Sequence, residues 1–169
     1  MKNNSIKEAQ KQKDVFSKVF LQLSHLERAI SWFTENSGLS VQLTILVKLD
    51  QSYLVDGIEM EERKADLKTY WKNLMGQEIE FGFFHNREIG TIFIAGPLSE
   101  LFLHDIDGKK LGALSEGPYG IFRGLGISDA EANRYLKQLN EGHYLLLARG
   151  NELDYYTIDR MLDDLKSTG

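Results

Sequence analysis

The sequence predicts a single α+β domain of ferredoxin-like (split β-α-β) type, an open sheet whose helices lie mainly on one face. Two observations lead to this fold class. A strand–helix–strand pattern occurs over residues 17–49, a second is spread over residues 89–149, and two such units side by side form a sheet of this type. In addition, 169 residues with 42% hydrophobic side chains are enough for one hydrophobic core and too few for two.

The first unit is predicted as a strand at residues 17–23, a helix at 24–37 and a strand at 41–49. Ser24 and Glu27 have the spacing of a capping box, which would start the helix. Apolar residues then recur at helical spacing, and the second strand alternates apolar with polar residues. A unit of this kind normally places its two strands parallel, joined by a right-handed crossover.

Residues 50–88 are predicted to be an insertion between the two units. Residues 59–75 are rich in charge and have one narrow apolar stripe at helical spacing, which is typical of a surface helix. Residues 78–84 alternate in polarity and are expected to pair as a hairpin with the strand at 89–95.

The second unit comprises the strand at 89–95, a helix at 128–141 and a strand at 143–149. Ser128 and Glu131 repeat the capping-box spacing at the start of this helix. The last strand contains a continuous apolar run, which is expected when a strand is covered on both faces.

The ends of the chain are predicted to lie outside this pattern. Residues 1–13 are interpreted as a polar leader, and residues 14–169 as the single domain. A C-terminal helix at about 152–165 would be an addition to the sheet.

Composition excludes several classes of function. The chain has no cysteine, so disulfides, thiolate catalysis and cysteine-based zinc sites are ruled out. With a net charge of −5 and no basic cluster outside the leader, nucleic-acid binding is not expected. There is no signal peptide and no apolar window of the ~18 residues that a membrane helix needs, so the expected location is the cytoplasm.

One cluster of metal-ligand residue types occurs at His104, Asp105 and Asp107. It lacks a known metal-ligand spacing, and an ordinary solvated turn is the favoured interpretation. A calcium loop starting at Asp105 would place Lys109 and Lys110 where an oxygen ligand and a glycine are required. Neither a metal nor a cofactor is therefore expected, and no residue is assigned a catalytic role.

Glycines are frequent before the second capped helix, from Gly112 to Gly126. Backbone N–H groups at such a helix start can bind phosphate, but neither common phosphate-loop motif is present. Asp129 and Glu131 also occupy the first turn, where they would repel phosphate. These glycines are interpreted as serving tight turns and close approach of the backbone.

Two segments resemble a known family. Residues 124–149 combine a GLGI motif, an acidic capped helix, a glycine and an apolar strand ending in arginine, and residues 91–97 read TIFIAGP. Together they resemble the bacterial heat-induced or general stress protein domain (YflT-type). That family has no established enzymatic activity, so the resemblance implies a fold and a loose association with stress, and it transfers no catalytic residue.

This chain departs from that family between the two segments. Many relatives have a run of glycine and alanine there that suits helix or membrane packing, whereas this chain has charged residues. A membrane-facing role is therefore not expected. Residues 150–169 lie beyond the resemblance.

Three hypotheses of function follow. The first is a non-enzymatic regulatory or stress-associated domain that acts through self-association or partner binding. It would be a homodimer, because a second copy could cover the open sheet face at 144–148 and the hairpin phenylalanines Phe81, Phe83 and Phe93.

The second hypothesis is a small-molecule-binding domain. Its pocket would lie between the 112–126 segment and the helix at 59–75. The speculative ligand-binding residues are His104, Tyr119, Arg123 and Arg149. The third hypothesis, an enzyme built on the His104 cluster, ranks last.

Overall fold

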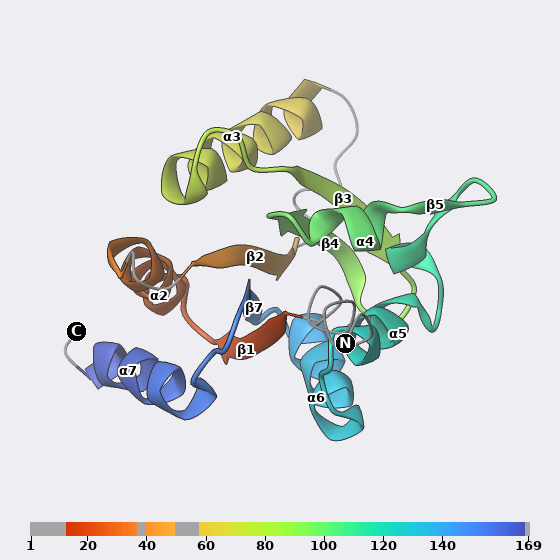
Figure 1. The fold of residues 1–169 in the computed structure, drawn as a ribbon. Helices are drawn as coiled ribbons and strands as arrows, with labels where there is room; N and C mark the ends of the chain where they lie inside the picture. Colours follow the sequence, from red (N-terminus) through yellow and green to blue (C-terminus); the bar gives the residue numbers. More distant parts are fainter. Residues whose placement is uncertain (1–12, 37–39, 50–57, 168–169) are drawn as a thin grey trace, which may run out of the picture.

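The computed structural model describes residues 13–36, 40–49 and 58–167 (Figure 1). In this part of the chain, five strands form one open antiparallel sheet in the order β1-β7-β2-β4-β3. The strands are β1 (Asp14–Phe20), β2 (Val41–Lys48), β3 (Phe81–Asn86), β4 (Gly90–Ala95) and β7 (Tyr144–Gly150). The helices are α2 (Leu23–Glu35), α3 (Ile58–Met75), α4 (Ser99–Leu103), η2 (Leu111–Ala113), α5 (Gly117–Gly124), α6 (Asp129–Asn140) and α7 (Tyr155–Ser167). A small hairpin, β5 (Asp105–Ile106) and β6 (Lys109–Lys110), completes the α+β fold that the sequence predicts.

Two strand–helix–strand units interleave in the sheet. β1 and β2 both run antiparallel to β7, which lies between them, so β1 and β2 are parallel to each other. In the same way, β4 and β7 are parallel, with β2 between them. Each unit therefore receives a strand of the other between its own two strands.

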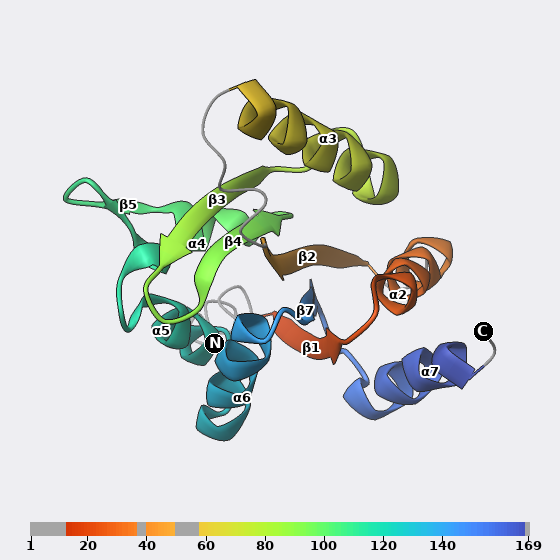
Figure 2. The same ribbon diagram turned by 180° about the vertical axis from the view of Figure 1, so that it is seen from behind.

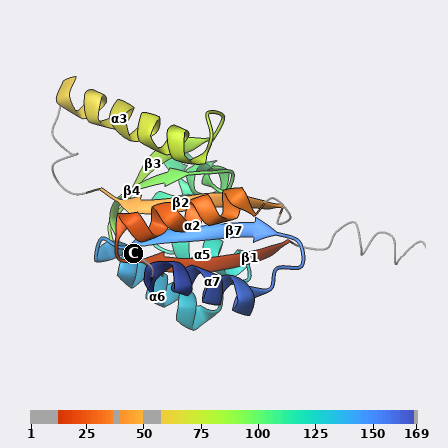
Figure 3. The same ribbon diagram turned by 90° about the vertical axis from the view of Figure 1, so that its left-hand side faces the viewer.

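Helices cover both faces of the sheet, so the prediction that they lie mainly on one face is wrong. α2, α3 and α7 pack on the face with Phe16, Ile45 and Leu146, whereas α4, α5 and α6 pack on the opposite face. Figures 2 and 3 show this arrangement, with α2 and α7 on one side and α5 and α6 on the other. The physical reason lies in β7, because its alternate residues Leu145 and Leu146 are fully buried on opposite faces.

The two crossovers have opposite hands. The first unit crosses the sheet from β1 to β2, and the second crosses it the opposite way, from β4 to β7. The strands of the two units are also antiparallel to each other. If both crossovers had the same hand, their helices would therefore lie on the same face of the sheet. The second unit inserts α4, a hairpin and α5 before α6, and this long connection lies on the other face.

The helix starts agree only in part with the predicted capping boxes. Ser128 caps α6 as predicted, since its Oγ accepts a hydrogen bond from the Glu131 N–H at 3.2 Å. The predicted capping box at Ser24 is wrong. α2 begins one residue earlier, at Leu23, because β1 ends at Phe20 and leaves only a short turn before the helix.

The insertion adds one edge strand and one loosely packed helix. β3 pairs with β4 at the edge of the sheet, and α3 docks on it through Trp71, which is 2% exposed. No helix among the described residues is both long and apolar enough to pass through a membrane.

Candidate functional site: a groove along the free edge of β1

An antiparallel sheet has two free edges, and here they differ. The β3 edge is protected, since Lys110 Nζ donates a hydrogen bond of 2.6 Å to the Phe83 carbonyl. Lys64 and Lys68 of α3 also lie over the rings of Phe83 and Phe81. Lysines at an edge strand are a common protection against the pairing of further strands.

Among the described residues, no strand pairs with the outer edge of β1. The Tyr135 hydroxyl contacts the Ser17 carbonyl at 3.5 Å, and the Tyr155 hydroxyl interacts with the backbone of Val15. Both contacts place these backbone groups on the side away from β7. Because backbone direction alternates along a strand, Val19 points the same way, and three residues offer an N–H and a C=O each.

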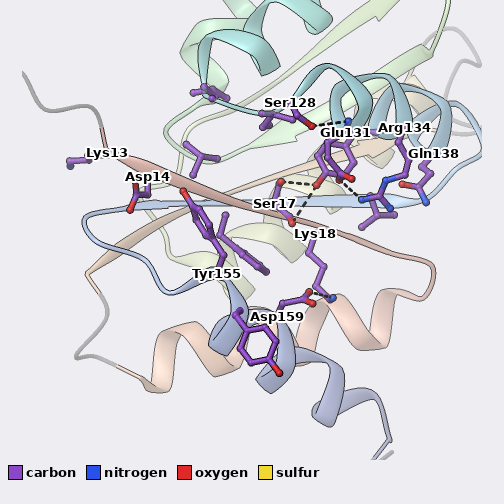
Figure 4. Close-up of a pocket in the computed structure, with 18 of the residues that line it drawn as sticks. Lys13, Asp14, Ser17, Lys18, Ser128, Glu131, Arg134, Gln138, Tyr155 and Asp159 are labelled. Atoms are coloured by element: carbon purple, nitrogen blue, oxygen red, sulfur yellow. Dashed lines mark hydrogen bonds and ion pairs between the residues drawn. The ribbon is translucent and has the colours of Figure 1, made fainter.

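This edge lies in a groove of about 820 Å³. β1 forms its floor, α6 with the preceding turn forms one wall, and the first turns of α7 form the other (Figure 4). Figures 1 and 2, which are opposite views, both show β1 between α6 and α7. We call this feature the β1 groove.

The alternation of β1 assigns its side chains to the two walls. Ser17 extends towards α6, and Lys18 extends towards α7 (Figure 4). Phe16 packs beneath α7 and stacks on Tyr155, with ring centroids 6.4 Å apart. Asp14 accepts a hydrogen bond of 3.0 Å from the Leu153 N–H. This bond fixes the segment before α7 to the start of β1.

On the α6 wall, a hydrogen-bonded group lies beside the strand edge. Ser17 Oγ is 2.7 Å from the Tyr135 hydroxyl, and Glu131 is paired with Arg134. Burial and the nearby Glu131 raise the pKa of Tyr135, although the hydrogen bond from Ser17 acts in the other direction. Tyr135 thus keeps its proton at neutral pH and cannot serve as a base for Ser17, so these groups are suited to hydrogen bonding.

On the α7 wall, Lys18 forms ion pairs with two carboxylates. Its ammonium contacts Asp159 and lies 3.0 Å from Asp163. Burial lowers the pKa of Lys18, but the hydrogen bonds to Asp159 and Asp163 outweigh it and hold the pKa above its usual value. Lys18 is therefore charged at neutral pH and holds α7 against the strand.

Exposed aromatic side chains also line the α7 wall. Tyr155 is 46% exposed and Tyr156 is 75% exposed, and Leu21 at the end of β1 is 66% exposed. Large apolar side chains exposed together beside a groove are typical of surfaces that bind other proteins.

The residues proposed from the sequence as ligand-binding lie elsewhere. His104 follows α4 on the surface, Tyr119 and Arg123 are on α5, and Arg149 is in β7, and none of them lines the β1 groove. Tyr119 instead donates a hydrogen bond to Asp129.

The 112–126 segment and α3, between which a pocket was expected, pack on opposite faces of the sheet and line different pockets. Leu125 and Gly126 reach the β1 groove, whereas α3 borders a separate pocket of about 740 Å³ with Val47 and Tyr144. Among the described residues, no three histidine or carboxylate side chains gather closely enough to hold a metal ion.

Sequence reasoning missed most of the residues that form the β1 groove. Ser17, Lys18, Tyr135 and Asp159 come from three elements that are distant in the chain. The one available signal was Lys18, a charged residue inside an apolar strand.

Comparison with known proteins adds no relative. No protein-family model, no curated protein and no solved structure matches this chain.

Proposed function

We propose that this protein is a binding domain that takes up an extended segment of a partner protein along β1 by strand addition. In this mode of recognition, main-chain hydrogen bonds supply affinity and the flanking side chains supply specificity. The observation that carries the proposal is the set of outward-facing backbone groups at Val15, Ser17 and Val19, lying within a groove with two helical walls.

The spacing of these groups favours a peptide over a small molecule. Alternate residues of a strand are about 6.8 Å apart, and each presents one donor and one acceptor in the same direction. An extended peptide backbone repeats donors and acceptors at the same interval. Few other ligands could satisfy all three residues at once.

The two tyrosine hydroxyls act as temporary partners for the edge. Tyr155 and Tyr135 each contact one outward-facing backbone group, and an incoming strand would replace both contacts. Each main-chain hydrogen bond gained contributes only about 0.5–1.5 kcal/mol net. We therefore expect dissociation constants of about 1–100 μM for short peptides.

A second copy pairing through β1 fits the groove less well than a peptide. Adjacent strands lie about 4.8 Å apart, whereas packed helices need about 8–10 Å. α6 and α7 flank β1 on both sides, so two facing grooves would bring the helices of the copies into contact. The homodimer stays a prediction, but the uncovered sheet face that motivated it is covered by helices.

Two further expectations remain predictions. The resemblance of residues 91–97 and 124–149 to the general stress domain would place the binding event in a stress response. The small-molecule alternative now rests on the pocket beside α3, which has an apolar floor formed by Leu67, Trp71 and Val47.

Selection from a phage-displayed library of random dodecapeptides tests the proposal. Enriched peptides should bind the wild type, and they should slow hydrogen exchange at the amides of Val15, Ser17 and Val19. Val19→Pro removes one outward donor, so it should weaken binding about tenfold or more. Leu101→Ala, on the surface of α4, is the matched control and should bind as the wild type does.

Two results would contradict strand addition. Enriched peptides that bind Val19→Pro equally well, or that leave the β1 amides unprotected, would place binding elsewhere. Protection that rises with protein concentration in the absence of peptide would identify a second copy as the occupant.

A further inference from the structure

The two walls of the β1 groove differ in chemistry. Side chains of an added strand alternate between them, because successive residues of a strand point to opposite faces. The chemistry of each wall therefore sets the residue type that fits each face of the partner. This inference rests on the proposed strand addition.

On the α6 side, Val15, Val19, Leu125 and Ile127 offer apolar neighbours, while Glu131, Arg134 and Gln138 of α6 line the same wall with polar groups. Residues opposite Val15 and Val19 would lie about 5 Å from those side chains, within reach of Leu125 and Ile127. Burial of β-branched residues is favourable at such cross-strand positions. The guest positions opposite Val15 and Val19 therefore favour apolar residues.

On the α7 side, the neighbours are two tyrosines, the carboxylate of Asp159 and the ammonium of Lys18, which is paired with Asp159. The guest residue opposite Phe16 would lie next to Tyr155 and Tyr156, with Asp159 one turn further along the helix. The side chain of Asp159 is 52% exposed, although it also pairs with Lys18. A guanidinium can stack on a tyrosine ring and donate hydrogen bonds to a carboxylate at the same time.

The charge of the C-terminal segment also favours a basic guest residue. Residues 152–164 contain five carboxylates and a single basic residue, Arg160. Lys18 and Lys166 offset part of this charge through their ion pairs with Asp159 and Asp163. The segment has more carboxylates than basic side chains, which favours a basic guest over an acidic one.

From this asymmetry we infer that the partner segment is an amphipathic strand, with apolar residues facing α6 and an arginine or lysine facing α7 beside Tyr155 and Asp159. Acidic strands are disfavoured at this position. The groove would thus discriminate between partners by the charge of one face of the strand.

Three symmetric synthetic peptides test this preference in either strand direction. They are Thr-Thr-Val-Arg-Val-Thr-Thr and the same sequence with Gln or with Glu in place of Arg. We expect the Arg peptide to bind about tenfold more tightly than the Glu peptide, with the Gln peptide between them, in isothermal titration calorimetry at low salt. Hydrogen exchange at Val15, Ser17 and Val19 locates each peptide.

Two variants assign the preference to the α7 wall. Asp159→Asn should reduce the ratio between the Arg and Glu peptides several-fold, and Tyr156→Ala should weaken the Arg peptide alone. Asp163→Asn removes an equal charge from α7 outside the groove lining, and it should leave most of the ratio unchanged.

The outcomes separate the two proposals. Equal affinities for all three peptides, with protected β1 amides, would overturn the basic preference and leave strand addition in place. Tighter binding of the Glu peptide would overturn the preference as well. If none of the three protects the β1 amides, both proposals fail.

Discussion

At the scale of single residues, β1 is defined by alternation. Phe16, Lys18 and Phe20 point towards α7 and α2, and Val15 and Ser17 point towards α6. The sequence predicted a strand at 17–23 because Leu21 and Leu23 extend the apolar run. In the structure the strand starts at Asp14 and ends at Phe20, and Leu21 is left exposed at its end.

This alternation predicts unequal effects of proline at adjacent positions. The N–H of Val19 points away from β7, so Val19→Pro should cost little stability, whereas the N–H of Lys18 faces β7. Lys18→Pro should lower the free energy of unfolding by about 2–3 kcal/mol more than Lys18→Ala does, because it leaves a buried carbonyl without its donor. Urea unfolding followed by circular dichroism measures the stability of each variant. An equal loss of stability for Val19→Pro and Lys18→Pro would contradict the assigned directions of the two N–H groups.

The ion pairs of Lys18 predict a specific dependence on pH. The pKa of Lys18 is raised in the folded state, so its stabilisation is present below its ordinary pKa of about 10.4 and is lost as the pH rises through the higher folded value. Burial raises the pKa of Asp163, but the interactions with Lys18 and Lys166 lower it by a larger amount, so the folded-state pKa lies below the ordinary value. Its stabilisation is therefore present above about pH 3.9 and is lost as the pH falls through the lower folded value.

Lys18→Met keeps the apolar stem and removes the charge. It should lower the free energy of unfolding by about 0.5–1 kcal/mol at pH 7 and by clearly less at pH 2.5, where the carboxylates take up protons. Urea titrations of both proteins at the two pH values measure this difference. If the difference in the free energy of unfolding is as large at pH 2.5 as at pH 7, packing and not charge accounts for the contribution of Lys18.

At the scale of elements, periodic segments were predictable and the glycine-rich segment was not. The helices at 58–75 and 129–140 agree with prediction within two residues, because their apolar spacing reflects burial on one side. The segment from Gly112 to Gly126 was interpreted as turns, yet it contains α5. Ile121 and Phe122 are buried against α4 and α6, and these tertiary contacts outweigh the poor helix propensity of glycine.

Two of these glycines do serve the backbone roles that were expected. A Cβ at Gly117 would overlap the carbonyl oxygen of Leu111, so close approach requires glycine there. Gly126 has a φ of +91°, which a residue with a side chain rarely adopts. The local chemistry was therefore predictable, while the helix between these two points depended on contacts distant in sequence.

The β1 groove was even less predictable from the local sequence. Its existence depends on β7 inserting between β1 and β2, which leaves β1 at the edge, and on α6 and α7 arriving on opposite faces. Neither event has a local signature around residues 14–20. Edge position is decided by the order of strands, and only the charged residue in β1 hinted at it.

At the scale of the whole molecule, a double-layered cover replaces the single layer that the sequence predicted. Leu145 and Leu146 are adjacent in β7, both are fully buried, and they belong to the two different hydrophobic clusters. Had one sheet face been open, as in the homodimer that the sequence predicted, only one of these leucines would be buried by helices of its own chain. Here both are buried in this way.

Leu145→Ala and Leu146→Ala should therefore each lower the free energy of unfolding by about 2–5 kcal/mol, since each opens a cavity within a packed layer. Their effects should be the same at low and high protein concentration, because helices of the same chain fill both layers. Urea unfolding at two concentrations about a hundredfold apart, with sedimentation velocity on the same samples, measures both properties. A loss for Leu145→Ala that shrinks at high concentration would mean that a second copy contributes to the cover of that face. The two helical layers would then be insufficient on their own, and the groove at β1 would have to be considered within a dimer.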